Sequence, residues 1–254
     1  MLTEQDFRMF TKLRIGAFGR KIQEIIEDQS WDSVGFEDKI AAALDAEIEA
    51  RHNRRVAKLI SKSHFKLKDA CPEEIIYLPE RSLTPDRIMR FCACEWIKKA
   101  ENLLIISATG SGKSYIAQAI GNAAMRKEIS AFYVTMSDLE RMLDESRANG
   151  TYYRLIDQLS DVELLILDDL FTTAPSQSFV TELFHLIDLR EGRTSTIVCS
   201  QSTPDVWYEV IGIEVIADSL LNRLVKNARV ITIEGPNMRE VLAKKKESAP
   251  DYWK

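Results

Sequence analysis

Short apolar runs alternate with longer amphipathic stretches from about residue 100 onward. The runs consist mainly of Leu, Ile and Val, and each has the length of a buried strand core. Strands separated by helix-length segments are typical of a parallel sheet with helices on its faces. The pattern therefore predicts an α/β fold with a parallel five-stranded sheet. The predicted strands are Leu103–Ile106, Ala131–Thr135, Leu164–Leu167, Thr196–Cys199 and Val230–Ile233.

The chain before residue 82 has a helical pattern instead. Apolar residues recur at helical spacing, for example at Ile22, Ile25 and Ile26. Glycines are few here and lie near predicted helix breaks. We therefore predict a small all-helical N-terminal domain over residues 1–82.

A proline-marked stretch, residues 71–87, separates this helical part from the α/β part. Thr84 followed by Pro85 is typical of a helix N-cap and first helical position. We place the second domain at residues 83–254. Within it, the sequence from Ser137 to Glu140 is a capping-box pattern and predicts a helix start.

Residues 107–114 read SATGSGKS between a predicted strand and a predicted helix. They match the phosphate-loop pattern G-x-x-x-x-G-K-[ST], except that Ser107 replaces its first glycine. Glycines let backbone amides approach phosphates, Lys113 can neutralise them, and the Ser114 hydroxyl can hold Mg²⁺. The flanking strand and helix favour an ATP site over a glycine-rich turn with an incidental lysine. The candidate ATP-binding residues are Ala108, Thr109, Gly110, Ser111, Gly112, Lys113 and Ser114.

A second motif, ELLILDD, ends in Asp168 and Asp169, with the first aspartate 55 residues after Lys113. An apolar strand ending in an acid beside a phosphate loop is the Walker B arrangement. We expect Asp168 to hold Mg²⁺ and Asp169 to orient or deprotonate the attacking water. The alternative is an aspartate that only forms a turn. Because aspartate is shorter than glutamate at the second position, slow hydrolysis is our hypothesis.

Two later residues are further candidates for the ATP site. Gln201 follows the fourth strand, where it can sense the γ-phosphate or simply form a turn before Thr203 and Pro204. Arg223 lies on an otherwise apolar helix. It is either a surface arginine or an arginine finger that reaches a neighbouring subunit's γ-phosphate.

Segments over nearly the whole chain resemble the insertion-sequence helper ATPases, the IstB family of the AAA+ superfamily, close to DnaC helicase loaders and DnaA initiators. The resemblance is specific to this family because it extends well outside the phosphate loop. It is carried by LRIG from Leu13, FED from Phe36, LDAE from Leu44, RHNRR from Arg51, CEWI from Cys94, ENLL from Glu101, STIV from Ser195, SQ at Ser200, WYEVIG from Trp207, AD at Ala217, LVKNA from Leu224, and MR at Met238.

The resemblance implies an ATP-dependent DNA-binding regulator encoded beside a transposase. Such proteins assemble on DNA with ATP, remodel it and license the transposase for integration. The resemblance also implies that Arg223 is a trans-acting finger, that Arg239 is a second nucleotide sensor, and that ATP sites lie at interfaces of a homo-oligomer. The family lacks a full helical lid, in agreement with the 15 residues that follow Arg239.

This chain departs from the family pattern at two places. Ser107 replaces a glycine, and the Phe-Thr-Thr sequence from Phe171 lacks the glycine that often follows the acidic pair. A serine at the strand-to-loop bend either adopts an allowed conformation or costs about 1 kcal/mol. We expect both departures to affect the rate of hydrolysis more than ATP binding.

Charge is distributed unevenly along the chain. The 254 residues hold 34 Lys and Arg and 39 Asp and Glu, a net charge of −5 that argues against bulk coating of nucleic acid. Residues 51–68 nevertheless hold seven Lys or Arg and no acid. The remaining residues hold 27 basic and 39 acidic side chains, a net charge of −12. The chain therefore combines a cationic segment with an acidic remainder.

The cationic segment predicts contact with DNA phosphates. Its basic residues recur three or four apart on one helical face, while Val56, Leu59 and Ile60 lie on another. We expect salt-dependent binding that is largely independent of sequence, since no base-reading motif is present. One alternative is a helix face that is simply solvated. The other is a helix that lies on a membrane surface, but the apolar face has few bulky side chains that could anchor it there. The candidate DNA contacts are Arg51, Arg54, Arg55, Lys58 and Lys62.

The N-terminal sequence is polar and predicts no secretory signal, and no apolar run is long enough to span a membrane. The four cysteines, Cys71, Cys92, Cys94 and Cys199, form neither a zinc pattern nor a disulfide framework. We therefore expect reduced thiols, a cytoplasmic location and no membrane partner.

Three functions are compatible with these patterns. The first is an ATP-driven, DNA-bound helper of a transposase. The second is a DnaC-like loader that binds a replicative helicase in DNA replication and uses ATP as a timer. The third is an ATP-binding protein without turnover, suggested by Ser107 and Asp169. A neighbouring gene for a transposase favours the first function, and a replication locus favours the second.

Overall fold

The computed structural model describes residues 2–247. The chain divides into two compact units, Met1–Lys58 and Leu59–Lys254. None of the helices described between residues 2 and 247 is both long and apolar enough to cross a membrane. None of the four cysteines is in a disulfide.

The first unit is helical and has a small core. Thr3 caps its first helix in a reciprocal capping box with Asp6. Among the apolar residues that the structure describes between residues 2 and 58, only Ile25 and Ala43 are buried. Its elements are α1 (Glu4–Lys12), α2 (Gly16–Glu27), the 3₁₀ turn η1 (Gln29–Trp31) and the part of α3 (Phe36–Lys62) that precedes Leu59.

Glu47 is the buried polar centre of this first unit. One of its carboxylate oxygens accepts hydrogen bonds from the backbone amides of Ala17 and Phe18, at the start of α2. The other oxygen accepts from Arg51 at 2.9 Å and from Arg54 at 3.1 Å. The bond from Arg51 is the main cause that lowers the pKa of Glu47. Glu47 thus joins α3 to the positive end of α2.

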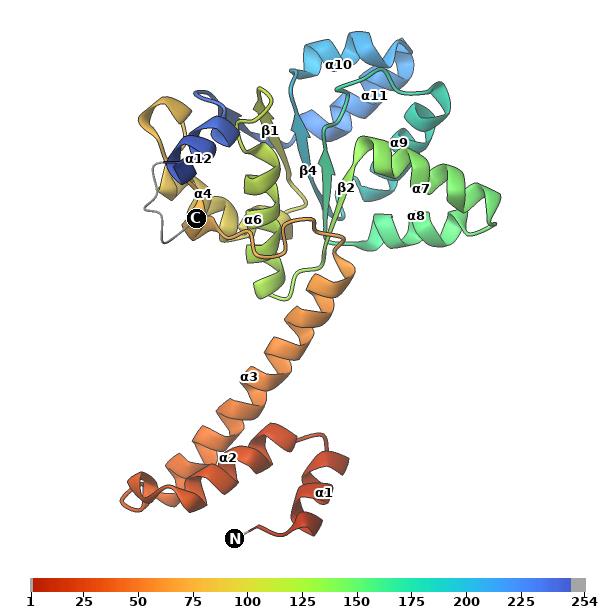
Figure 1. Ribbon diagram of the computed structural model, residues 1–254. Helices are drawn as coiled ribbons and strands as arrows, with labels where there is room; N and C mark the ends of the chain where they lie inside the picture. The colour runs from red at the N-terminus through yellow and green to blue at the C-terminus, as the bar shows by residue number, and fades with distance from the viewer. Residues whose placement is uncertain (1, 248–254) are drawn as a thin grey trace. The chain divides into compact units, whose positions relative to one another are not determined.

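The second unit is a parallel five-stranded sheet with helices on both faces (Figure 1). Its strands are β1 (Asn102–Ser107), β2 (Ala131–Thr135), β3 (Leu164–Asp168), β4 (Ser195–Ser200) and β5 (Ala228–Ile233). Its helices are α4 (Pro85–Cys92), α5 (Glu95–Lys98), α6 (Lys113–Arg126), α7 (Met136–Ala148), α8 (Tyr152–Asp161), α9 (Gln177–Arg190), α10 (Pro204–Ile211), α11 (Glu214–Val225) and α12 (Met238–Glu247), with the 3₁₀ turns η2 (Pro72–Glu74) and η3 (Pro79–Arg81).

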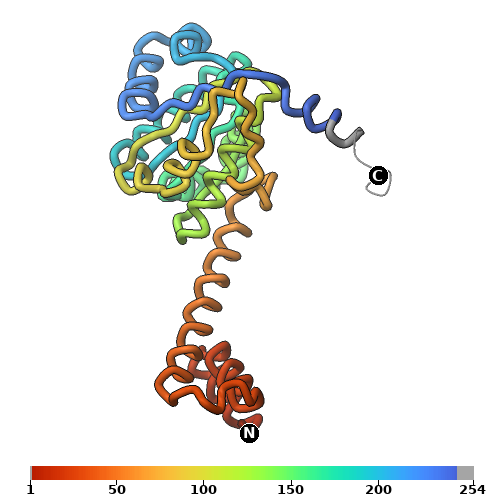
Figure 2. The backbone as a smooth tube through the Cα atoms, turned by 90° about the vertical axis from the view of Figure 1, so that its left-hand side faces the viewer, coloured from red at the N-terminus to blue at the C-terminus, as the bar shows by residue number. Residues whose placement is uncertain are grey.

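The strand order is β2-β3-β4-β1-β5, and all neighbouring strands are parallel. One face of the sheet packs against α4, α5 and α6, and the other packs against the helices from α7 to α11. Figure 2 looks onto the first of these faces. The order places β1 between β4 and β5, so the loop after β1 lies beside the end of β4.

The segment that precedes the sheet in sequence reaches both of its outer strands. On β2, the backbone amide of Tyr133 donates to the carbonyl of Ser63 at 2.8 Å. On β5, the guanidinium of Arg87 donates to the carbonyl of Val230 at 2.6 Å. Residues 59–82 therefore belong to the compact unit of the sheet, and the division lies 24 residues before the predicted boundary at residue 82.

The predicted fold class is confirmed, and each predicted strand lies within an observed one. Two local expectations differ from the structure. The helix predicted to open at Ser137 begins at Met136, because the side chain of Thr135 caps it by accepting from the amide of Asp138. The stretch after Lys62 is irregular with short 3₁₀ turns, because it follows the sheet and α6 instead of forming its own helix.

Candidate nucleotide-binding site

The phosphate loop connects β1 to α6 at the carboxyl edge of the sheet. Gly110 and Gly112 have φ angles of 82° and 93°, which side chains disfavour. α6 begins at Lys113, so its free amides and positive dipole end face the loop. The loop therefore has the backbone conformation and the helix terminus that bind phosphate groups.

Ser107 occupies the first loop position without strain. It is the last residue of β1, is buried, and is absent from the described non-glycine residues with positive φ. Its hydroxyl is hydrogen-bonded to that of Ser111 within the loop. Of the two expectations for this serine, the structure supports an allowed conformation, and the side chain joins the two ends of the loop.

Lys113 and the acidic pair meet at the floor of the site. The ammonium of Lys113 lies 3.6 Å from Oδ1 of Asp169, and the lysine is only 5% exposed. Asp168, at the end of β3, is buried, and its Oδ1 accepts from the amide of Asp169 at 2.9 Å. The structure therefore places Asp169 against the lysine, with Asp168 buried next to Asp169.

Gln201 also lies at the phosphate loop. Its Oε1 accepts a hydrogen bond from the hydroxyl of Thr109 at 2.7 Å. Because β4 pairs with β1, the residue after β4 is adjacent to the loop after β1. Gln201 is therefore held at the loop that is expected to bind the phosphates.

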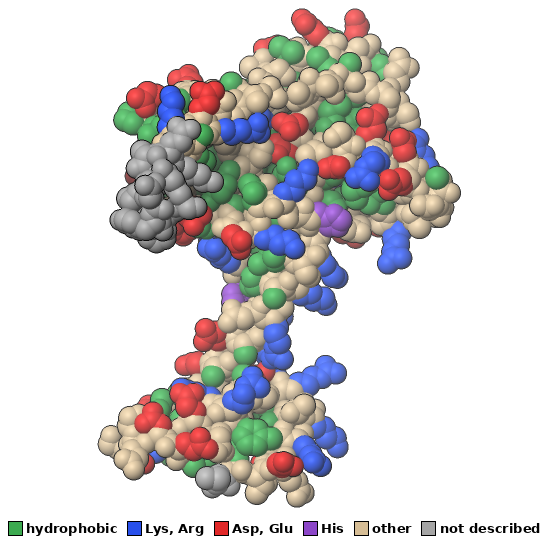
Figure 3. Space-filling model, viewed as in Figure 1, with side chains coloured by type: hydrophobic (Ala, Val, Ile, Leu, Met, Phe, Trp, Pro, Cys, Tyr) green, Lys and Arg blue, Asp and Glu red, His purple; other side chains and the backbone are tan. Residues whose placement is uncertain are grey.

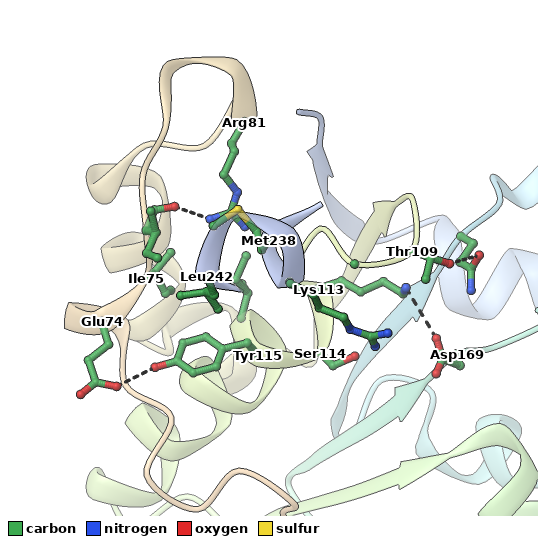
Figure 4. A pocket seen from close by; sticks show the side chains of 16 residues that line it. Glu74, Ile75, Arg81, Thr109, Lys113, Ser114, Tyr115, Asp169, Met238 and Leu242 are labelled. Atoms are coloured by element: carbon green, nitrogen blue, oxygen red, sulfur yellow. Dashed lines mark hydrogen bonds and ion pairs between the residues drawn. The ribbon is translucent and has the colours of Figure 1, made fainter. Parts of the chain in front are cut away.

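A cavity of about 430 Å³ extends from these residues (Figure 4). Lys113 and Asp169 line one end, and both Ser114 and Gln201 also contribute. The other end has an apolar wall with a tyrosine ring. A polar end beside an apolar end suits a triphosphate attached to a flat base. Figure 4 places Ile75, Tyr115 and Leu242 at this second end, where the Tyr115 hydroxyl donates to Glu74 at 3.0 Å.

Arg81 is a wall residue that the sequence did not indicate. Its guanidinium donates to the carbonyl of Ser111 at 2.6 Å and to the carbonyl of Ile76. It is buried, and this burial lowers its pKa. Arg81 thereby ties the phosphate loop to the wall near Ile76. Only its position in the proline-marked stretch distinguished it in sequence.

The C-terminal helix α12 closes another side of the cavity. The amide of Met238 donates to the carbonyl of Gly110 at 2.8 Å. A Cβ on Gly110 would lie 2.2 Å from the side-chain oxygen of Asn237, so a larger residue at this position would have to displace that side chain. Arg239 lines the cavity, as its proposed sensor role requires.

Arg223 lies away from this cavity. The carbonyl of Arg223 accepts from Asn102 at 2.9 Å, and Asn102 begins β1, about 16 Å from the strand's far end. Its guanidinium is 2.6 Å from Asp188 and 3.1 Å from Glu191. It also lies 5.0 Å from the centre of the Phe184 ring. Arg223 therefore does not enter its own subunit's site.

The five candidate DNA contacts lie on α3, and all are exposed. Figure 3 shows Lys and Arg side chains gathered along this helix. Arg51 and Arg54 are ion-paired with Glu47, which lies just outside the acid-free segment. Part of the positive charge of the segment is thus compensated within the first unit.

The comparisons with known proteins agree with this architecture. The family model described as IstB-like ATP binding protein matches residues 9–248. Two insertion-sequence ATP-binding proteins of Sinorhizobium fredii are similar over most of both chains. The first, y4pL, is 30% identical over 94% of this chain and 97% of its own length. The second, y4uH, is 31% identical over 95% of this chain and 97% of its own length.

Solved structures of replication proteins share the fold. DnaA of Aquifex aeolicus bound to AMPPCP has a TM-score of 0.56 and 23% identity, over 70% of this chain and 54% of its own. The DnaC helicase loader has a TM-score of 0.56 and 17% identity, over 65% of this chain and 97% of its own. Because the family model spans almost the whole chain and the core matches the AAA+ fold, this chain belongs to the IstB-like ATP-binding protein family.

Proposed function

We propose that the protein is an ATPase that assembles on DNA and assists a partner transposase in target selection and integration. The observation that carries this proposal is the phosphate loop beside Lys113, Asp168 and Asp169, in a chain whose insertion-sequence relatives match almost end to end. The relatives support a role in an insertion sequence, and the residues of the site support the binding and hydrolysis of ATP.

ATP is the cofactor that fits the cavity. Loop amides and Lys113 would bind the phosphates, while the apolar end would take the adenine base. Ser114 and Asp168 would hold Mg²⁺, which usually takes few protein ligands together with phosphates and waters. Among residues 2–247, no cluster of three His, Cys, Asp or Glu residues forms a separate metal site. Bound Mg²⁺ would neutralise charge that develops on the transferred phosphoryl group.

Asp169 is our candidate for the residue that activates water. Its side chain is about half exposed and faces Lys113, so water can reach it. In this position its carboxylate can accept the proton of an attacking water. Gln201, held by Thr109, would then report the presence of the γ-phosphate.

The position of Arg223 supports assembly into an oligomer in which two neighbouring subunits contribute residues to each ATP site. Arg223 lies beside the start of β1, and the phosphate loop of the same subunit follows the end of that strand. A catalytic role for Arg223 therefore requires the site of another subunit. Two carboxylates hold the guanidinium, and only about a quarter of the side chain is exposed. An arginine held in one orientation loses less conformational entropy when it contacts a phosphate.

ATP is expected to control assembly on DNA. With DNA and a non-hydrolysable ATP analogue, we expect large DNA-bound particles, and with ADP mainly small free species, because each site is completed by the next subunit. Sedimentation and particle imaging measure both states. Particles of the same size with the analogue, with ADP and without nucleotide would contradict the proposed mechanism.

The cationic face of α3 is expected to contribute salt-dependent DNA affinity. Changing Arg55, Lys58 and Lys62 to Gln avoids the arginines that bind Glu47. If each residue contacts one phosphate, the slope of log affinity against log salt should become shallower by about 3. Fluorescence anisotropy with two unrelated DNA sequences measures this slope and the lack of sequence preference.

A control for that experiment removes the same charge elsewhere. Arg90, Lys98 and Lys99 are exposed on the sheet unit and can be changed to Gln. This control should keep most of the affinity and salt slope. An equal loss in both triple variants would mean that overall charge, and not the face of α3, attracts DNA.

The helicase-loader alternative receives less support. Its basis is the fold shared with the DnaC helicase loader at 17% identity, whereas the two insertion-sequence relatives of Sinorhizobium fredii match in sequence over 94% and 95% of the chain. A transposase gene beside this one would favour our proposal, and a replication locus would favour helicase loading.

A further inference from the structure

Tyr133 connects an edge strand to the acid that we assign to Mg²⁺. Its hydroxyl donates to Oδ2 of Asp168 at 2.6 Å, and both residues are at least 95% buried. Tyr133 is aligned with Ile166 in the neighbouring strand. Asp168 lies two residues farther along on the same face, so the tyrosine side chain reaches along the sheet to its carboxylate.

The carboxylate of Asp168 is held at both oxygens. Oδ2 accepts from Tyr133, and Oδ1 accepts from the amide of Asp169. Each carboxylate oxygen has a second lone pair, so both oxygens keep acceptor capacity beside these bonds. Two donors fix the rotation of a carboxylate more strictly than one. Mg²⁺ demands near-ideal octahedral geometry, so this rotation matters for its binding.

The tyrosine ring is itself held in place by the segment that follows α3. Phe65 packs edge-on against it with ring centres 6.2 Å apart. The ammonium of Lys66 lies 5.8 Å from the ring centre. On the other side, Phe65 packs so closely on α6 that a Cβ on Gly121 would lie 2.5 Å from its ring. The ring therefore has little freedom to turn away from Asp168.

Burial alone does not account for this arrangement. A tyrosine used only for packing needs any one acceptor for its hydroxyl, and here it uses the acid of the nucleotide site. We propose that Tyr133 is a positioning residue whose hydroxyl holds Asp168 in the orientation that receives Mg²⁺ with ATP. This inference rests on the proposed function, because it requires an Mg²⁺–ATP site.

Tyr133→Phe is the direct test, since it removes the hydroxyl and keeps the ring. The full chain is titrated with Mg²⁺ at a fixed concentration of a fluorescent, non-hydrolysable ATP analogue. The Mg²⁺ concentration at half-maximal binding should rise about tenfold, as is common when a group holding a metal ligand is removed. Affinity for the analogue in EDTA should stay the same, because Tyr133 does not line the cavity.

Tyr208→Phe is the matched control. Tyr208 lies on α10 and packs against the opposite core, so its removal should leave the Mg²⁺ midpoint unchanged. A double variant with Asp168→Asn adds a second criterion. If Tyr133 acts through Asp168, the double variant should have the same Mg²⁺ midpoint as Asp168→Asn alone.

The possible results separate this inference from the proposed function. Mg²⁺-dependent binding by the wild type, with an unchanged midpoint in Tyr133→Phe, would overturn the role of Tyr133 only. No binding of the analogue by the wild type would overturn the ATP site itself. If Tyr133→Phe does not fold, Phe65→Leu keeps the hydroxyl and loosens the ring. It should raise the midpoint by a smaller factor, and an unchanged midpoint would again overturn the inference.

Discussion

Lys113→Ala should abolish ATP-dependent binding to DNA. The lysine supplies the buried positive charge of the phosphate loop, and its ammonium now faces Asp169 at 3.6 Å. Charge-assisted hydrogen bonds contribute about 1.5–3 kcal/mol each. Two such bonds to phosphates correspond to a loss of at least about a hundredfold in ATP affinity. Equilibrium binding of a fluorescent ATP analogue and gel shifts with and without ATP measure the two effects.

Lys98→Ala is a suitable control for this experiment. Lys98 forms a surface ion pair with Glu95, and such pairs contribute little to stability. The control should bind ATP and shift DNA like the wild type. An unchanged ATP-dependent shift in Lys113→Ala would refute the idea that nucleotide binding drives assembly.

Arg223→Ala should bind ATP normally but lose turnover by about a thousandfold, which is the order of effect of an arginine finger. The residue is far from its own cavity, so the affinity of an isolated subunit should not change. Steady-state phosphate release on DNA and binding of an ATP analogue measure the two quantities separately. Normal turnover on DNA would rule out the finger assignment.

Two controls separate a finger from a structural arginine. Asp188→Asn weakens the ion pair of Arg223 while the arginine remains, so turnover should persist. Mixing Arg223→Ala with Lys113→Ala subunits is the stronger control. Some interfaces then combine an intact phosphate loop with an intact Arg223, and partial turnover should return. Mixtures that stay inactive would show that Arg223 does not act across an interface.

Most of the sheet could be predicted from the sequence because β1, β2, β3 and β4 are buried on both faces. Such strands are continuous apolar runs, and their lengths separate them from helices. The range predicted for β2, Ala131–Thr135, is the observed one, and the other predictions are one or two residues too short at one end or at both. The positions of Lys113 and Asp168 could be predicted as well, since the loops that follow parallel strands lie at the same end of the sheet.

Other parts of the site could not be predicted because they depend on contacts distant in sequence. Arg81 reaches Ser111, and Tyr133 reaches Asp168, across 30 and 35 residues. Nothing in the local pattern around either residue distinguishes it from an ordinary arginine or strand tyrosine. The ion pair of Arg51 with Glu47 is not apparent from the acid-free segment either, because Glu47 precedes that segment.

The contacts of Ser63 and Arg87 with the outer strands have a consequence for solubility. Unpaired strand edges can pair with strands of other chains and lead to aggregation. Ser63 pairs with the free side of β2 at Tyr133, and Arg87 pairs with the free side of β5 at Val230. A fragment that begins at Glu95 would keep all five strands and the phosphate loop, yet would leave both edges open. The smallest soluble form of the ATP-binding unit should therefore include residues 63–92.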